Sequence, residues 1–160
     1  MAIAIGATAP DFELASNELT PEGKPGKTIR LSTFRGQASV VLAFYPLDFS
    51  PTCSGEMACF RDDVEAFRGL GAQVLGLSVD SAWAHAAFAQ AHGLAFPLLA
   101  DFEPKGAVAR AYGLYEEARG FAKRATVIVD RQGKVAYVAD HGLGTPRQNH
   151  DLLEVLKGLG

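Results

Sequence analysis

A continuous run of apolar residues, Val40–Tyr45, places the strongest constraint on how this 160-residue chain can fold. The run is rich in β-branched and aromatic side chains and holds no charged residue, which is the pattern of a strand covered on both faces. Helices are therefore expected on each side of this strand. A loop with two prolines follows and leads to Cys53, where a helical pattern begins.

The residues after this strand alternate between helical and strand patterns. In the first helical segment, apolar residues recur at steps of three and four. The predicted segments are, in order, a helix from Cys53 to about Gly69, a strand at Gln73–Val79, a helix at Ala82–His92, a short edge-like piece at Phe96–Leu99, a short helix at about 106–112, a hairpin of Ala125–Val129 with Val135–Val138, and a closing helix around Leu152–Leu156.

The turn-rich first 35 residues add short apolar pieces around Phe12–Leu14 and Ile29–Leu31, which predict short strands or a hairpin packed on the core. Since parallel strands need crossover helices and the last two strands form a hairpin, the order of segments implies a mixed central sheet with helices on both faces. This α/β order is that of a thioredoxin-like fold. The length and the lack of a linker favour one domain over residues 1–160.

Composition excludes several kinds of partner. The net charge is −3 and no run of lysine or arginine exists, so nucleic acid and anionic membranes are not expected partners. The longest apolar stretch, Ala38–Pro46, is less than half of the roughly 20 residues that span a bilayer. The N-terminus lacks the pattern of a signal peptide, so a cytoplasmic protein is expected. The four histidines lack the spacing of zinc ligands and most are expected at the surface, and no metal site is predicted.

Cys53 stands at the predicted junction between the strand and the helix. A thiolate is the reactive form of cysteine, and its pKa of about 8.5 falls at a helix N-terminus or beside a cation. Pro51, Gly55 and Glu56 place Cys53 in the first helical turn, where free backbone N–H groups can stabilise an anion. Position alone leaves two interpretations open, because a free cysteine is also a small hydrophobic residue that is commonly buried.

The residues around Cys53 resemble a known motif. Pro46, Ser50 and Cys53 form P-x-x-x-S-x-x-C, which is similar to the active-site motif of the peroxiredoxins. The resemblance is greatest to the one-cysteine AhpE-type branch, with the PrxQ (bacterioferritin comigratory protein) branch next. It extends, in the same order along the chain, to the segments Gly6–Phe12, Leu31–Gly36, Phe96–Asp101, Gly106–Val108, Ala111–Leu114 and Arg124–Asp130.

The resemblance implies a thiol-dependent peroxidase that reduces hydrogen peroxide or organic hydroperoxides. Cys53 would be the peroxidatic cysteine, whose thiolate becomes a sulfenic acid, and Arg124 would stabilise the thiolate and the departing oxygen. Ser50 would hydrogen-bond the peroxide, and Pro46 would shield the sulfur. Glu56 would either orient Arg124 or favour the helix dipole. The alternative is a non-catalytic thioredoxin-like binding or chaperone module in which Cys53 is inert.

The step that regenerates Cys53 depends on Cys59. Six residues along an ideal helix separate the Cα atoms by about 10 Å, whereas a disulfide needs about 7 Å or less. We therefore expect an external thiol, either a thioredoxin-like protein or a low-molecular-weight thiol, to resolve the sulfenic acid. A disulfide with Cys59 stays open, because local unfolding of the helix would permit it. No bound cofactor is expected, and the resemblance implies a homodimer.

Overall fold

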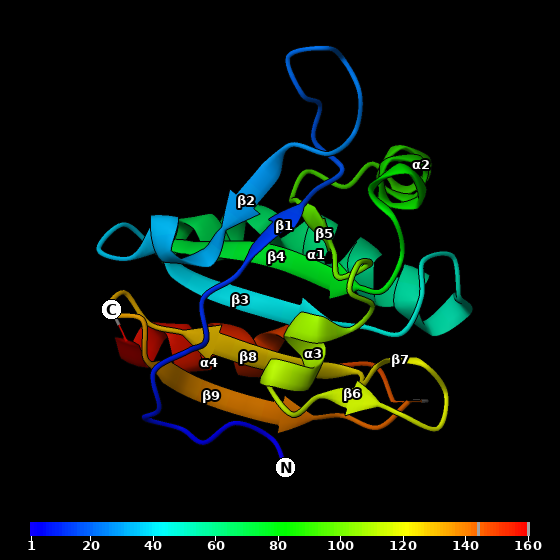
Figure 1. Ribbon diagram of the computed structural model, residues 1–160. Coiled ribbons are helices and arrows are strands. Elements are labelled where there is room, and N and C mark those ends of the chain that lie inside the picture. Colours follow the sequence, from blue (N-terminus) through cyan, green and yellow to red (C-terminus); the bar gives the residue numbers. More distant parts are fainter. Residues whose placement is uncertain (144, 160) are drawn as a thin grey trace.

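A computed structural model describes residues 1–143 and 145–159 of the chain. Its centre is a five-stranded sheet in the order β5–β4–β3–β8–β9 (Figure 1). The strands are β3 (Ser39–Phe44), β4 (Ala72–Ser78), β5 (Leu98–Ala100), β8 (Ala125–Val129) and β9 (Val135–Asp140). The first three are parallel, β8 pairs antiparallel with β3, and β9 pairs antiparallel with β8, as the predicted hairpin requires. The prediction of a mixed sheet is therefore confirmed.

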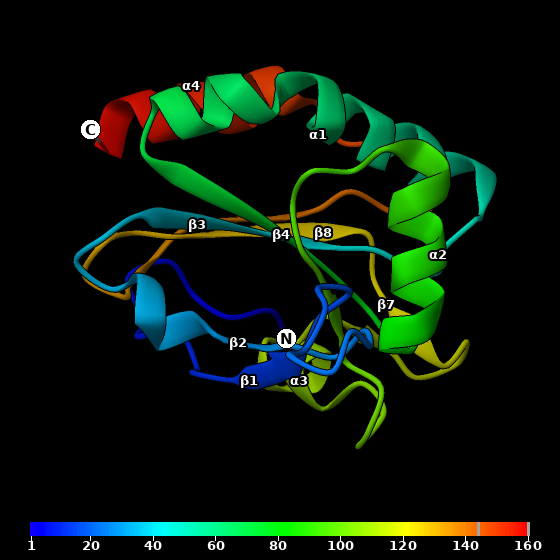
Figure 2. The same cartoon turned by 90° about the horizontal axis from the view of Figure 1, so that it is seen from above.

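Helices lie on both faces of this sheet (Figure 2). One face is covered by α1 and α4 with α2 beside them, and the other by α3 and the N-terminal hairpin of β1 and β2. The bounds are α1 (Pro51–Gly69), α2 (Ala82–His92), α3 (Ala107–Ala111), α4 (Asn149–Leu159), β1 (Glu13–Ala15), β2 (Thr28–Arg30) and a 3-10 helix at Leu31–Phe34. The expected N-terminal hairpin is present, since β1 and β2 pair antiparallel.

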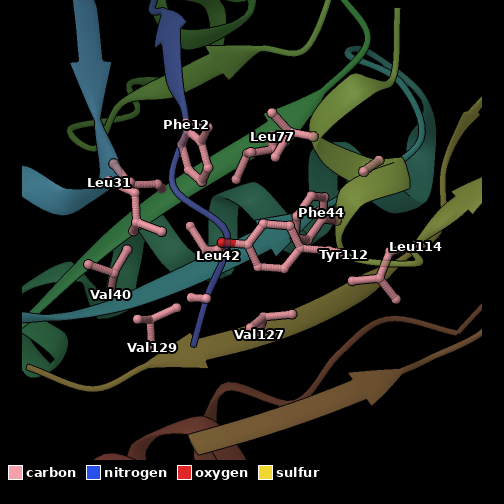
Figure 3. Close-up of a cluster of buried hydrophobic side chains, with 14 of the residues drawn as sticks. Phe12, Leu31, Val40, Leu42, Phe44, Leu77, Tyr112, Leu114, Val127 and Val129 are labelled. Atoms are coloured by element: carbon pink, nitrogen blue, oxygen red, sulfur yellow. The ribbon is translucent and has the colours of Figure 1, made fainter. Parts of the chain in front are cut away.

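Strand β3 supplies both hydrophobic cores because its side chains alternate between the two faces. Val40, Leu42 and Phe44 enter the core beneath α3 and the N-terminal segment, where Tyr112 lies among them (Figure 3). Val41 and Ala43 enter the opposite core, with the aromatic residues of α1 and α2. All six residues of the strand are buried, which explains why the sequence shows an unbroken apolar run instead of an alternation.

Strand pairing brings distant parts of the chain together at one end of the sheet. Phe44, the last residue of β3, lies opposite Ala125, the first residue of β8. The loop that leads from β3 to α1 therefore starts beside Arg124. A small hairpin of β6 (Tyr115–Glu116) and β7 (Phe121–Ala122), which the sequence patterns did not predict, precedes Arg124 (Figure 1).

Two further expectations concern the segment around Pro97 and the exposure of the histidines. The piece around Pro97 was expected at an edge, and β5 is an edge strand of the sheet. The expectation that most histidines lie at the surface is wrong for His85, which is fully buried on α2. The Ala-rich sequence of this helix has little periodicity, so it did not reveal which side faces the protein. Among the described residues, no helix is both long and apolar enough to cross a membrane.

Candidate active site

Cys53 is the third residue of α1, and its side chain is fully buried. Ser50 has extended backbone angles at the N-cap, and Pro51 is the first helical residue. Proline suits this position because it has no N–H group to leave unpaired. Helix geometry leaves the N–H groups of Thr52 and Cys53 without carbonyl partners in the helix, so the positive end of α1 lies at the sulfur.

Arg124 reaches Cys53 from the position immediately before β8, the strand that pairs antiparallel with β3. Its Nη1 donates a hydrogen bond to Cys53 Sγ at 3.3 Å, and its Nε donates to the carbonyl of Leu143 at 2.9 Å. The side chain is almost fully buried. Burial alone would lower the pKa of Arg124, but its hydrogen bond to Cys53 and the charge of Glu56 raise the pKa above its usual value. A permanent cation therefore lies beside the sulfur.

Glu56 lies one turn beyond Cys53 and accepts a hydrogen bond from Arg124 Nη1. Burial alone would raise the pKa of this carboxyl, but the charges and hydrogen bonds of Arg147 and the charge of Arg124 hold the pKa below its usual value. Glu56 is therefore an anion. Of the two roles considered for Glu56, the contact favours orientation of Arg124 over an interaction with the helix dipole.

Arg147 is a buried residue of this site that the sequence did not reveal. Its Nε and its backbone N–H both donate to Glu56 Oε2, at 3.0 and 2.6 Å. Its guanidinium also donates to the carbonyls of Phe44 and Ala125, the paired residues at the ends of β3 and β8. Arg147 lies in an irregular segment before α4, and a single arginine in such a segment is usually exposed at the surface. The one hint was Glu56, since a carboxylate between apolar helix residues needs a cationic partner.

A cavity of about 250 Å³ lies beside Arg124 and the start of α1. Three of the residues predicted for the site, Pro46, Ser50 and Arg124, line it together with Leu47, Pro51, Thr52, Arg119, Phe121 and Leu143. Pro46 is buried, and Ser50 is partly exposed. The Ser50 hydroxyl donates a hydrogen bond to the carbonyl of Leu47 at 3.1 Å. The Ser50 oxygen can therefore accept a hydrogen bond from a molecule in the cavity.

Cys59 lies apart from this cavity. It is exposed on the same continuous helix as Cys53, and both cysteines are free thiols. Cys59 lines a second cavity of about 440 Å³ with residues of α1 and with Pro146 and Arg147. Because α1 is unbroken between the two cysteines, a disulfide between them would require the first turns of the helix to unwind.

Comparison with known proteins gives a consistent result. Residues 5–138 match the profile of the AhpC/TSA family. The chain is 38% identical over 133 residues to alkyl hydroperoxide reductase E of Mycobacterium tuberculosis, covering 83% of this chain and 82% of the relative. It is 38% identical over 141 residues to peroxiredoxin Bcp of Bacillus subtilis, covering 84% and 83%. The resemblance to the AhpE and PrxQ branches is thereby confirmed.

Solved structures agree with this result. The crystal structure of peroxidoxin BcpB from Mycobacterium tuberculosis superimposes with a TM-score of 0.83 at 30% identity, covering 98% of this chain and 97% of that one. AhpC of Mycobacterium tuberculosis gives a TM-score of 0.87 at 29% identity, covering 99% and 94%. The predicted thioredoxin-like α/β fold is confirmed by these neighbours.

Proposed function

The chain belongs to the AhpC/TSA family and is a peroxiredoxin, a thiol-dependent peroxidase, and on this basis we propose that Cys53 is the residue that attacks the peroxide. The observation that carries the proposal is the 3.3 Å hydrogen bond from Arg124 Nη1 to Cys53 Sγ. It supports a thiolate at the start of α1, where a cation and free N–H groups meet. Family membership decides against the alternative of a binding module with an inert cysteine.

In the proposed reaction, the Cys53 thiolate supplies an electron pair to the terminal oxygen of a hydroperoxide. A sulfur–oxygen bond forms as the oxygen–oxygen bond breaks, so the sulfur is oxidised to a sulfenic acid and the peroxide is reduced. The departing oxygen takes up a proton and leaves as water or an alcohol. Arg124 stabilises the negative charge on that oxygen, because its guanidinium stays protonated and offers several donors.

Ser50 and Pro46 shape the peroxide position in this proposal. The Ser50 oxygen accepts a hydrogen bond from the O–H group of the peroxide, which is supported by its place on the cavity wall and by its own proton being directed to the carbonyl of Leu47. Pro46 is buried on the same wall and limits access of water to the sulfur. Glu56 acts through Arg124, whose guanidinium it holds on the side of Cys53.

We propose that an external thiol, from a thioredoxin-like protein or a low-molecular-weight compound, resolves the sulfenic acid. The thiol sulfur attacks the sulfenic sulfur, a mixed disulfide forms and water leaves. A second thiol then releases Cys53. The unbroken α1 between Cys53 and the exposed Cys59 supports this route over an internal disulfide.

The remaining expectations are proposals of the same kind. We propose that residues 1–160 act as one domain in the cytoplasm and that two copies form a homodimer across the edge near the active-site loop. The dimer is supported by Leu47 and Phe49, two large apolar side chains that this loop exposes.

One experiment with two matched variants tests the proposal. Reduced protein is mixed with one equivalent of hydrogen peroxide and a reagent that traps sulfenic acids, and the adduct is located by mass spectrometry. The wild type and Cys59→Ser should both form the adduct on Cys53 at the same rate, and Cys53→Ser should form none. Slow oxidation of both thiols without selectivity would refute Cys53 as the nucleophile. Loss of turnover with thioredoxin in Cys59→Ser, with the first oxidation intact, would refute the external-thiol route.

A further inference from the structure

The cavity beside Arg124 is lined by a second arginine that the peroxidase chemistry described above does not use. Arg119 lies on its wall and is exposed to solvent. Arg124 is buried, and its guanidinium already donates hydrogen bonds to Cys53, Glu56 and the carbonyl of Leu143. The cavity therefore extends from the group that contacts the reacting sulfur to a second cation at the surface.

The hairpin of β6 and β7 fixes the position of Arg119. Its turn is closed by the backbone N–H groups of Arg119 and Gly120, which both donate to the carbonyl of Glu116, at 3.2 and 2.8 Å. Gly120 has a φ of 79°, a conformation that glycine adopts without a steric cost. Strand β7 ends two residues before Arg124, so the hairpin and the catalytic arginine lie at the same end of the sheet (Figure 1).

The charge of Arg119 is not matched by a neighbouring carboxylate. Two other cations near the hairpin are paired, because Arg110 donates to Glu117 at 2.9 Å and Lys123 lies 3.7 Å from a carboxylate oxygen of Asp140. Within residues 1–143 and 145–159, no carboxylate forms an ion pair with Arg119. Its guanidinium is thus available to a molecule that comes from the solvent.

The wall of the cavity is positively charged. It includes Arg119 and Arg124 but no aspartate or glutamate. Glu56, which lies outside this wall, compensates the charge of Arg124. The charge of Arg119 therefore remains to attract an anion into the cavity, although the chain as a whole has a net charge of −3.

The part of the cavity between the two arginines is apolar and small. Pro46, Phe121 and Leu143 contribute to its wall. Its volume of about 250 Å³ exceeds the roughly 150 Å³ of an apolar cavity that holds a benzene molecule. An aromatic ring or a short carbon chain therefore fits there, with a peroxide group toward Arg124 and an anionic group toward Arg119.

We propose that Arg119 is a specificity-determining residue, which binds the carboxylate of a compact organic hydroperoxide while the peroxide group lies at Cys53. Arginine suits this role because its planar guanidinium can donate two parallel hydrogen bonds to a carboxylate. The inference rests on the proposed role of Cys53 and leaves its chemistry unchanged. The sulfur–oxygen bond forms, the oxygen–oxygen bond breaks, and the departing alcohol carries the carboxylate away.

Two matched substrates test this role. One is cumene hydroperoxide with a carboxylate in the para position of its ring, and the other is the methyl ester of the same compound. Stopped-flow measurement of Cys53 oxidation should show the wild type reacting about 3- to 30-fold faster with the acid than with the ester at low ionic strength, a range that lies between an exposed ion pair and a buried charged hydrogen bond. Added salt should reduce this preference, because it screens exposed charges.

Three variants separate contact with Arg119 from a general effect of charge. Arg119→Gln should react with the acid and the ester at nearly equal rates. Arg119→Lys should keep part of the preference, because it keeps the charge but not the planar fork. Arg131→Gln removes an exposed arginine beyond the other end of β8, and it should keep the wild-type preference.

Several outcomes would overturn the proposal. Equal rates for the acid and the ester in the wild type would do so, and so would a preference that persists in Arg119→Gln. The sulfenic acid is also treated with 3-mercaptopropionate and with the neutral 2-mercaptoethanol. If Arg119→Gln changes only the ratio of these two rates, the carboxylate belongs to the reducing thiol and the assignment to the hydroperoxide is wrong.

The same experiments distinguish failure of this inference from failure of the proposed function. Rapid oxidation of Cys53 by the ester, without a preference for the acid, refutes the role of Arg119 and leaves that of Cys53 intact. If neither substrate oxidises Cys53, binding of the carboxylated alcohol product to Cys53→Ser, measured by calorimetry, still tests Arg119. Binding should weaken by about 3- to 30-fold when Arg119→Gln is added, and unchanged binding would refute the contact.

Discussion

Replacement of Arg124 by methionine tests the proposed site most directly, because it removes the cation beside Cys53 and keeps an unbranched side chain. Hydrogen bonds to charged groups contribute about 1.5–3 kcal/mol. Each 1.36 kcal/mol changes a rate by tenfold, so loss of the 3.3 Å bond to a thiolate should slow peroxide reduction by about 10- to 150-fold. Coulomb attraction over this distance at an effective dielectric constant of 20 is about 5 kcal/mol, which sets the upper limit of the effect.

The fold should survive this change, since Glu56 keeps its hydrogen bonds from the side chain and backbone of Arg147. The assay is a stopped-flow measurement of Cys53 oxidation by hydrogen peroxide at fixed pH, with the unfolding midpoint measured alongside. Arg30→Met removes an exposed arginine that pairs with Asp11 and Glu13 on the N-terminal hairpin, and it should react like the wild type. A folded Arg124→Met protein within threefold of the wild-type rate, or an equal loss in the Arg30 control, would refute the reasoning.

Two more predictions concern Glu56, the buried partner of Arg124, and Arg147, which pairs with Glu56. Arg147→Met should lower the free energy of unfolding by about 3–5 kcal/mol, because it leaves a buried carboxylate and two strand-end carbonyls short of a donor. Denaturant titration measures this loss. A loss below about 1 kcal/mol, which is typical of a surface site, would contradict the prediction. Glu56 has a folded pKa below the ordinary 4.5, so its contribution to stability is complete above that pH and declines as the pH falls further. The stability difference between the wild type and Glu56→Gln should therefore shrink on acidification below 4.5 in denaturant titrations at several pH values, and a difference that widens would be inconsistent with the ion pairs.

Local patterns in the sequence predicted most of the fold. The unbroken apolar run of β3 indicated a central strand because burial on both faces removes the polar half of the usual alternation. The apolar residues that recur at steps of three and four in α1 likewise indicate a helix with one buried side. The hairpin of β6 and β7 escaped prediction because strands of two residues leave no period to detect.

Some residues of the site could be recognised from their neighbours in the sequence, and others only from contacts in the folded chain. Pro46, Ser50 and Cys53 are close in the sequence, so their motif is visible there, and Arg124 became a candidate only through the resemblance. Arg147 could not be found, because its burial depends on contacts with residues 91 and 103 positions away. The burial of His85 was missed for the same reason: its partners, Asp48 and the Leu99 carbonyl, meet only in the folded chain.

The charges around Cys53 connect the two halves of the proposed cycle. Arg124 and Arg147 bring two positive charges into a buried region, and Glu56 supplies one negative charge. In the proposed mechanism the Cys53 thiolate supplies a second negative charge, so the reduced site is electrically balanced. A buried charge left without a partner is costly. Oxidation to a neutral sulfenic acid removes this negative charge and weakens the electrostatic attraction between Arg124 and the sulfur. The step that consumes the peroxide thus weakens the contact that keeps Cys53 buried, at the point in the cycle when a thiol must reach it.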